Sequence, residues 1–447
     1  MNLLLSAVPV LLMGTGLFYM LKLKGFYFLH PCRVLSPLFD KKRGGGISPV
    51  KALLMALAGT LGVGNIVGVA TALSLGGAGA VLWMTVSALV AMVLKYAEIL
   101  LAVKHRRYTP DGSPEGGAPY YIEDGLTAVG LPKIGKLLAG VFAILCLCNT
   151  FTVGSMLQSN AVAGALEGGF GVPLWLTGAV VSLLCIPVVG GGAGKIAKLT
   201  EGIVPVMTVG FLLLCVAVIF LRRERVPDAI CHIFTDALSF KSAGGGFLGF
   251  FTSQALRYGV MRGLVSNEAG CGTAPMAHAA AHTDSPAEQG AFGFVEVFVD
   301  TILLCTVTAL AILVSDSGHL AYPDDGVHTA QAAFSSVLGE WAGGFFAVAV
   351  FFFGVATILC WAHYGMTSLR AMLRHHPRLF GVCRYLFLPG YALSVFLGAV
   401  VAPTWVWDMT DLALALMTLI NLFVLVLMSR EVKAETDLFL QKPRRRK

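Results

Sequence analysis

The sequence predicts an all-α polytopic membrane protein in which ten core helices form two inverted sets of five, preceded by one extra helix. Three observations favour this fold class: the composition, a series of long apolar runs, and two glycine-rich segments at matching places in the two halves. The 447 residues are 56% apolar and 13% charged, and the mean hydropathy is +0.78. Soluble domains carry about 25% charged residues, so the composition indicates a membrane protein.

Apolar runs long enough to cross a bilayer recur along the whole chain. A spanning helix needs about 20 residues, and backbone that crosses lipid must be satisfied within helices. The runs lie near residues 3–21, 48–73, 79–103, 136–164, 172–193, 203–221, 292–314, 344–369, 381–402 and 405–428, with a glycine-rich run at about 244–282. They predict about eleven transmembrane helices in a single domain, 1–447, which divides into an extra helix in 1–26, a first repeat over 47–221, a second repeat over 244–430 and a basic tail over 431–447.

The distribution of lysine and arginine predicts the topology. Basic residues mark the cytoplasmic side of a membrane protein. They gather in the segments 22–51, 104–136, 194–200 and 370–384 and in the tail, whereas the segments 74–80 and 165–171 contain none. We therefore expect a cell-membrane protein with its N-terminus outside and its C-terminus in the cytoplasm. The net charge of +7 then reflects topology and contact with anionic lipid, and nucleic-acid binding is not expected.

Two glycine-rich segments open the two sets of five helices. The first reads "GTLGVGNIVGVA" and the second "YGVMRGLVSNEAGCGTAP", and each contains one asparagine, Asn65 or Asn267. Interrupted helices at matching places in two halves are typical of secondary transporters built from inverted repeats. A break at mid-membrane leaves N–H groups free for a carboxylate and carbonyl groups free for a cation. Close helix packing through the Gly64–Gly68 pattern is the simpler alternative.

Several longer motifs resemble one family closely. They include "GVGNIVGVATALSLGGAGAVLWM", "RGLVSNEAGCGTAPMAHAAAHTD" and "QGAFGFVEVFVDTILLCTVTAL". Over nearly the whole chain, the sequence resembles the alanine or glycine:cation symporter family. The resemblance implies a LeuT-like fold with one extra N-terminal helix, and sodium-coupled uptake of small neutral amino acids by alternating access. It implies no enzyme activity and no cofactor, with sodium acting as the coupling ion. The sequence departs from the family pattern at Thr273, His363 and Met366.

The resemblance also implies a set of site residues. The substrate site would consist of Gly62, Gly64, Asn65, Gln158, Asn160, Asn267, Gly270 and Trp361. Sodium would be held by Thr60, Gly64 and Thr357. Thr357 and Trp361 are four residues apart in "ATILCW" and therefore share one helix face. A buried threonine that merely bonds back to its own helix is the alternative for Thr357.

Ionisable residues inside the apolar runs are costly in a membrane and are usually paired or functional. Glu296 and Asp300 lie four apart on one helix face, and we expect a salt bridge to Arg262 or Arg257 rather than a proton relay or a cation site. Lys95 is expected to pair with the nearby Glu98.

Other functions remain open on the sequence alone. "HAAAH" has the spacing of two metal ligands but lacks the glutamate of a metalloprotease helix, so we expect no metal there. An intramembrane hydrolase is a remote alternative, since no GxSxG nucleophile elbow occurs. A membrane structural or receptor-like protein would not need two broken helices. Within transport, the alternatives are coupling to protons and another small neutral amino acid.

Overall fold

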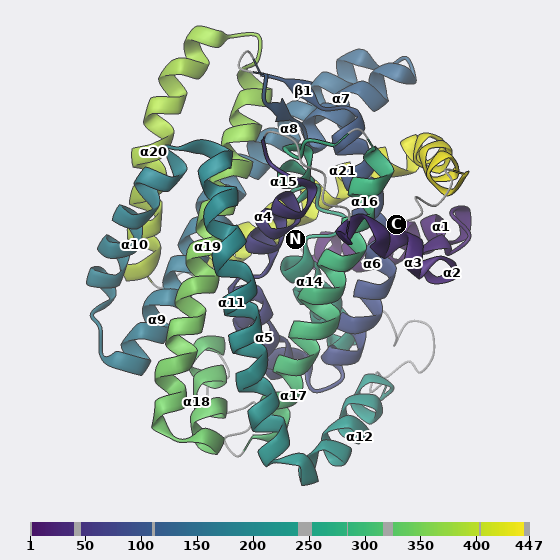
Figure 1. The fold of residues 1–447 in the computed structure, drawn as a ribbon. Helices are drawn as coiled ribbons and strands as arrows, with labels where there is room; N and C mark the ends of the chain where they lie inside the picture. The colour runs from purple at the N-terminus through teal and green to yellow at the C-terminus, as the bar shows by residue number, and fades with distance from the viewer. Residues whose placement is uncertain are drawn as a thin grey trace.

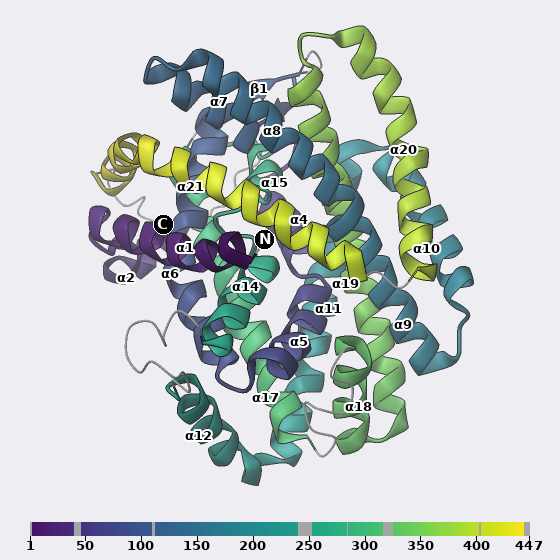
Figure 2. The same ribbon diagram turned by 180° about the vertical axis from the view of Figure 1, so that it is seen from behind.

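A computed structural model describes residues 2–39, 46–109, 112–239, 253–283, 285–315, 325–401 and 404–441, and nearly all of them are helical. Figures 1 and 2 show long helices crossing the molecule between two ends. One end carries α7 (Ala118–Ala128) and the short antiparallel pair β1 (Arg107–Tyr108) and β2 (Pro114–Glu115). The opposite end carries α12 (Val226–Ala237) and α18 (Gly326–Leu338). We call them the α7 end and the α12 end.

The first half of the chain supplies the N-terminal helices and the first five spans. The N-terminal helices are α1 (Asn2–Lys22), α2 (Phe26–Leu29), α3 (Pro31–Leu35) and the 3-10 helix η1 (Ser36–Phe39). The spans that follow are made by α4 (Pro49–Thr60), the 3-10 turn η2 (Val63–Asn65), α5 (Val67–Gly76), α6 (Ala80–Lys104), α8 (Pro132–Phe151), the π-helical turn η3 (Thr152–Leu157), α9 (Gln158–Phe170), α10 (Leu174–Val189) and α11 (Gly192–Leu221). The turn η4 (Arg223–Arg225) leads into α12.

The second half supplies the other five spans. They are made by α14 (Gln254–Asn267), α15 (Pro275–Ala279), α16 (Pro286–Val297), the π-helical turn η5 (Phe298–Cys305), α17 (Thr306–Val314), α19 (Glu340–Leu373), α20 (Pro377–Val400) and α21 (Thr404–Gln441). Residues 244–252 of the expected glycine-rich run lie outside the described residues. Helix α21 continues past the expected end of the repeat at residue 430, so residues 431–441 of the expected basic tail are helical.

The lengths of these helices confirm a polytopic membrane protein. Among the described residues, seven helices are long and apolar enough to span a bilayer, and the pair Pro49–Thr60 and Val63–Gly76, bent by 60°, makes an eighth. The apolar helices Ala7–Lys22 and Leu174–Val189 are shorter. Together with the interrupted pair α14–α15, these elements correspond to the eleven expected runs.

The spans pack into two groups. Helix α6 packs along α14 and α16, and α14 also contacts α5, so both broken spans lie in one group. Helices α8, α9, α10, α19 and α20 contact one another in the other group. Contacts of α19 with α4 join the two groups. Helix α1 lies beside α6 and α21, outside the five-plus-five core (Figure 2).

Both breaks occur where the sequence favours them, for different local reasons. In the first, the backbone is extended at Gly62, and an added Cβ there would lie 2.7 Å from Thr357 Oγ1. Glycine is needed because the neighbouring helix approaches so closely. In the second, Gly270 and Gly272 have φ of +91° and +79°, which side chains disfavour. Both breaks therefore form where glycine removes a steric penalty.

Candidate functional site

The first break, between α4 and α5, is contacted by a glutamine from α9. Gln158 Oε1 accepts a hydrogen bond of 3.1 Å from the Val63 N–H inside the break, while Gln158 Nε2 donates 3.1 Å to the Val153 carbonyl. Gln158 follows directly after the π-helical turn η3, and such turns are frequent at functional sites. The structure therefore places Gln158, predicted from the sequence, against Gly62 and Val63.

Thr357 of α19 contacts the same break from another side. Its hydroxyl lies 2.9 Å from the Ala58 carbonyl of α4 and 3.0 Å from the Phe353 carbonyl of its own helix. Thr60 instead donates to the Ala56 carbonyl, 3.3 Å away in its own helix. Of the predicted sodium ligands, Thr357 thus reaches across to the end of α4, and Thr60 bonds within α4.

The start of α5 combines an uncapped helix terminus with unfilled space. No side chain caps this terminus, which follows Ile66. Gly68, in the first turn, is buried, yet an added Cβ would meet no heavy atom within 4 Å elsewhere in the described chain. Gly64 faces a different neighbour, since its added Cβ would lie 3.5 Å from Ser266 Cα. The first turn of α5 therefore offers free N–H groups beside space that no described side chain fills.

Two aromatic side chains of α19 carry unsatisfied polar atoms beside η3 and α4. Trp361 and Tyr364 are fully buried, and their rings meet edge to face at 5.4 Å. Trp361 Nε1 and Tyr364 Oη find no hydrogen-bond partner among the described residues. Trp361 packs on Gly154 of η3, and Tyr364 packs on Gly59 of α4. Buried polar groups without partners are rare in folded proteins and are often completed by a ligand or water.

Asn160, another predicted site residue, lies elsewhere. Its Nδ2 is 3.4 Å from the Val401 carbonyl at the end of α20, and the side chain is only half-buried. The structure does not bring Asn160 to the first break. Gln158 and Asn160 of α9 contact different neighbours, because positions two apart do not share a helix face.

The second break, between α14 and α15, is satisfied from within the protein. Glu98 of α6 accepts hydrogen bonds from the N–H groups of Gly270 (3.2 Å) and Gly272 (2.9 Å). Asn421 of α21 donates to Glu98 and to the Gly270 carbonyl, the latter at 2.8 Å. Asn267 accepts 2.9 Å from the Ala269 N–H. The predicted residues Asn267 and Gly270 thus lie in a break whose polar groups already have partners.

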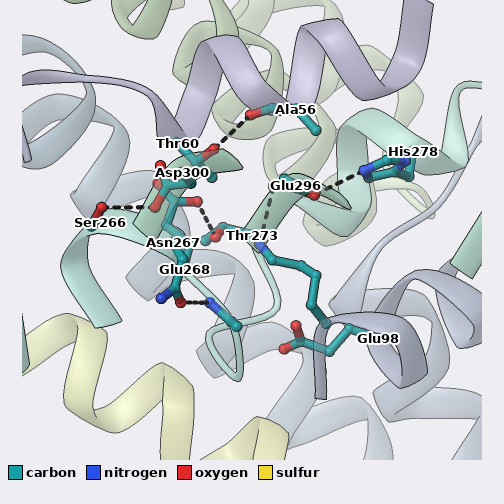
Figure 3. A network of polar contacts seen from close by, with 12 residues as sticks. Ala56, Thr60, Glu98, Ser266, Asn267, Glu268, Thr273, His278, Glu296 and Asp300 are labelled. Atoms are coloured by element: carbon teal, nitrogen blue, oxygen red, sulfur yellow. Dashed lines mark hydrogen bonds and ion pairs between the residues drawn. The ribbon is translucent and has the colours of Figure 1, made fainter. Parts of the chain in front are cut away.

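Glu268 and Thr273 complete the turn at the second break, because the Thr273 hydroxyl donates to the Glu268 carboxylate. Thr273 is one of the departures from the family pattern, and it takes a structural hydrogen bond here. Figure 3 shows Glu268, Thr273 and Asn267 close to Asp300 and Glu296.

Asp300 links the two breaks through neutral hydrogen-bond donors and does not form the expected salt bridge. Its carboxylate accepts hydrogen bonds from Asn65 Nδ2 (2.8 Å), Ser266 Oγ (2.8 Å) and Thr301 Oγ1 (2.7 Å). Arg262 lies 3.6 Å from Asp411 instead and stacks on a tryptophan, Trp407. The expected pairing of Asp300 with Arg262 or Arg257 is therefore wrong, because the interior of the bundle supplies neutral donors to this carboxylate.

Glu296 has a basic partner, but from another helix than expected. Its Oε1 lies 3.2 Å from Lys95 Nζ, and both side chains are fully buried. His278 Nε2 contacts Glu296 Oε2 at 3.0 Å, as Figure 3 shows. The expected Lys95–Glu98 ion pair is wrong, since Glu98 turns to the second break while Lys95 turns to α16.

A cavity of about 570 Å³ opens at the α7 end and reaches α19 at Ala362 and His363. Its walls come from β2, α19, α20 and the junction of α10 with α11. The innermost lining residues on α19 include Ala362 and His363, next to Trp361. Arg370 and Glu115 line the cavity nearer its mouth and form an ion pair with each other.

The match to a known family covers the complete chain. The family model described as the sodium:alanine symporter family matches residues 1–447. The chain belongs to the sodium:alanine symporter family. This is a transporter family, so the chain is a multi-pass transporter of the amino-acid:cation symport kind.

Curated relatives of this symporter family carry different substrate names. Sodium/alanine symporter AgcS of Methanococcus maripaludis is 36% identical over 440 residues, which cover 96% of this chain and 93% of AgcS. The probable sodium/glutamine symporter GlnT of Bacillus subtilis is 34% identical over 426 residues, which cover 95% of this chain and 85% of GlnT.

A solved structure confirms the fold of this symporter. MhsT, crystallised in complex with L-phenylalanine, aligns with a TM-score of 0.57 at 14% identity, covering 89% of this chain and 93% of MhsT. The expected LeuT-like arrangement of two five-helix repeats with broken first spans is therefore confirmed.

Several residues of this symporter site were missed by sequence reasoning. Tyr364 and Asn421 come from segments whose motifs point to no particular contact, and Glu98 was expected to pair with Lys95 instead. Ser266 had a usable signal, because it lies beside Asn267 in the interrupted segment. Glu98 could only have been found by knowing that α6 packs against the second break.

Proposed function

We propose that the protein couples uptake of a small neutral amino acid, alanine or glycine, to uptake of sodium. The observation that carries the proposal is the unfilled space beside Gly68 at the uncapped start of α5. A substrate carboxylate would bind the free N–H groups there, since a helix N-terminus favours negative charge.

Gln158 and Trp361 support the rest of the substrate site. Gln158 fixes the shape of the break by accepting from Val63 N–H. The Trp361 indole N–H and the Tyr364 hydroxyl supply hydrogen-bonding atoms that lack partners in the described chain. Asn65, which meets Ser266 and Asp300, would couple the site to the second broken span. Asn267 and Gly270 would then act by shaping that span.

Sodium would bind where Thr357 meets the end of α4. The Ala58 carbonyl and the Thr357 hydroxyl are neutral oxygen donors 2.9 Å apart, which suit a hard cation. Carbonyl groups at the end of α4 lack helical partners, and the helix dipole concentrates negative charge there. An ion at this position would hold α4 against α19 and favour one shape of the break.

The cavity at the α7 end supports an inward route for release. The basic segments favour a cytoplasmic α7 end, with the N-terminus outside and the C-terminus inside. The cavity reaches His363, two residues after Trp361 in α19. Alternating access would close this side by rocking one group of helices against the other.

Topology can be tested with two exposed native cysteines, Cys231 of α12 and Cys32 of α3, which lies in the basic segment 22–51. In a variant that retains only Cys231, a membrane-impermeant maleimide should label intact cells. A variant that retains only Cys32 should be labelled after permeabilisation alone. The reverse pattern would overturn the proposed orientation.

Uptake into proteoliposomes tests the function itself. Labelled L-alanine should accumulate when sodium is present outside and should not when choline replaces it. Glycine should compete with alanine, whereas glutamine and leucine should compete poorly because each extra methylene in a closed pocket costs about 1–3 kcal/mol. Strong competition by glutamine would assign a larger substrate, and sodium-independent uptake driven by a proton gradient would assign proton coupling.

A further inference from the structure

Helix α1 lies outside the five-plus-five core, and the proposed transport mechanism gives it no role. It packs along α6 and α21 (Figure 2). Two hydrogen bonds attach it to α21, from the Tyr19 hydroxyl to the Leu425 carbonyl (2.5 Å) and from Lys22 Nζ to Ser429 Oγ (2.6 Å). The second bond brings the charged end of α1 to the place where the apolar part of α21 is followed by its polar C-terminal turns.

Four basic side chains gather at this junction, and we call them the α1–α21 basic cluster: Lys22, Lys24, Arg430 and Lys433. The positive charges of Arg430 and Lys433 both act on Lys22. Lys24, two residues further along the chain, is exposed, as is Arg430. Because like charges repel one another, an anion bound among these side chains would lower the electrostatic energy of the cluster.

The acidic residues on the same helix do not neutralise the cluster. Glu431 and Glu435 of α21 form ion pairs with Lys104 of α6. Within the described ranges, Lys433 is the one member of the cluster that has an ion pair, to Asp437 at 2.6 Å. The other three members therefore keep their charges available for an anion from outside the chain.

Exposed apolar side chains lie along both helices and lead to the cluster. On α21, Phe423 and Leu427 lie seven and three residues before Arg430, on the same helix face. On α1, the exposed Phe18 lies one turn before Lys22, and the centre of its ring is 5.1 Å from Lys22 Nζ. Each helix thus presents an apolar face that ends in positive charge, which matches an acyl chain that ends in a phosphate.

We infer that the α1–α21 basic cluster binds the phosphate of one anionic phospholipid, whose acyl chains lie along the exposed apolar faces of α1 and α21. Groups of lysine and arginine beside a membrane span attract anionic lipids. The Arg430 guanidinium can donate two hydrogen bonds to a phosphate, and the lysines add point charges. The apolar faces favour a lipid over a free phosphate, which the charges alone would hold.

The lipid would strengthen the contact between α1 and α21, and α21 also supports the second break. Asn421, nine residues before Arg430, donates to Glu98 and, at 2.8 Å, to the Gly270 carbonyl. A lipid that holds α1 against α21 would therefore help to keep Asn421 at the second break. Since a ligand of the folded state stabilises it, anionic lipid should raise the melting temperature of the protein.

The test measures lipid binding to the purified full-length protein in neutral detergent by native mass spectrometry. Wild-type protein should bind dioleoylphosphatidylglycerol at least about tenfold more tightly than dioleoylphosphatidylcholine, equivalent to about 1.4 kcal/mol. The double variant Lys22→Gln/Arg430→Gln should lose this preference, although glutamine at position 22 can still donate to Ser429. Equal affinities of the wild type for the two lipids would overturn the inference.

A matched control separates this site from general attraction by charge. Lys195→Gln/Lys198→Gln in α11 removes two exposed lysines and changes the net charge equally, and it should keep the preference for phosphatidylglycerol. Equal losses in the two double variants would show that net charge attracts the lipid and that no such site exists.

Arg430→Gln alone decides the question if the double variant does not fold. Arg430 is exposed and forms no ion pair or hydrogen bond with a described residue, so its removal should leave the fold intact. This single variant should weaken binding of phosphatidylglycerol by a smaller factor than the double variant. In that case, wild-type affinity in Arg430→Gln would contradict the inferred site.

Glycerol phosphate tests whether the ligand must be a lipid. In large excess it should neither displace phosphatidylglycerol nor raise the melting temperature. If it does both, the cluster binds a soluble phosphate compound, and the inferred lipid site is overturned. These measurements use no amino acid and no sodium gradient, so their outcome is independent of the proposed symport.

Discussion

The two broken spans have similar glycine-rich sequences but opposite local chemistry. At the second break, Glu98 accepts from the N–H groups of Gly270 and Gly272, so a glutamate of the protein occupies the place where a ligand carboxylate could bind. At the first break, the start of α5 has no side-chain cap, and space remains beside Gly68. The difference indicates that one break is available to a ligand while the other is completed internally.

This difference assigns different roles to breaks that an inverted repeat makes equivalent by topology. The proposed amino acid site belongs to the first break. We propose that the second break acts as a structural bend, in which Ser266 bonds Asp300 and Glu98 accepts from the Gly272 N–H. Substitutions at the two breaks should therefore separate loss of transport from loss of stability.

Filling the space beside Gly68 should have the largest effect on uptake. Gly68→Val would place methyl groups where the substrate is proposed to bind, and we expect alanine uptake to fall about a hundredfold, as for a loss of about 2.8 kcal/mol of binding. The matched control is Gly140→Val in α8, where an added Cβ also meets nothing within 4 Å in the described chain. Uptake in Gly68→Val equal to that of the control would show that the substrate binds elsewhere.

Removing the glutamine contact should have the next largest effect. Gln158→Leu leaves Val63 N–H without its acceptor inside the protein, and an unsatisfied buried donor costs about 1–3 kcal/mol. We expect about a tenfold lower kcat/KM for alanine. Gln331→Leu in α18 changes another buried glutamine, which bonds the Gly343 carbonyl away from the first break, and should be milder. Equal losses in the two variants would remove the special role of Gln158.

Substitution of Thr357 should change the sodium dependence of uptake more than the affinity for the amino acid. Thr357→Ala removes the hydroxyl beside the Ala58 carbonyl, and the sodium concentration for half-maximal uptake should rise severalfold, or about 1 kcal/mol. Thr357→Ser retains the hydroxyl and should behave like the wild type. Unaltered sodium dependence in Thr357→Ala would mean that the hydroxyl only bonds to its own helix.

Glu98→Gln should lower stability while leaving the affinity for the amino acid nearly unchanged. The amide can accept from only one of the two glycine N–H groups and presents N–H to the other, so thermal stability should fall by about 1–3 kcal/mol. The KM for alanine should stay within about twofold, because the first break is untouched. A large rise in KM with unchanged stability would contradict the separation of the two breaks.

The smallest effect is expected from a histidine outside both breaks. Burial lowers the pKa of His105, but hydrogen bonds to Asp124 and Glu431 outweigh it and raise the pKa from 6.5 to about 9. The raised pKa means that this contribution to stability is complete below pH 6.5 and is lost as the pH rises through about 9. We expect a loss of under about 1 kcal/mol, since the ion pairs are partly exposed. His105→Gln should remove this pH dependence from thermal unfolding without changing uptake at pH 6.

Much of the fold could be predicted from the sequence because backbone that crosses lipid must be satisfied within helices. The lengths of the apolar runs located the spans, and the positions of glycine and asparagine residues located both breaks. Side-chain partners could not be predicted in the same way. Lys95 and Glu98 are three residues apart in α6, yet they turn to different helices, and only the packing of α16 and α15 against α6 decides which carboxylate meets the lysine. The space beside Gly68 likewise depends on how several helices meet.

A structure determined with sodium and alanine bound would test the central claim most directly. The account predicts that the alanine carboxylate lies at the start of α5, near Val67 and Gly68, with its methyl group in the adjoining space and Glu98 still bonded to Gly270 and Gly272. Alanine found at the second break, with its carboxylate on the N–H groups of Gly270 and Gly272 and Glu98 displaced, would contradict it.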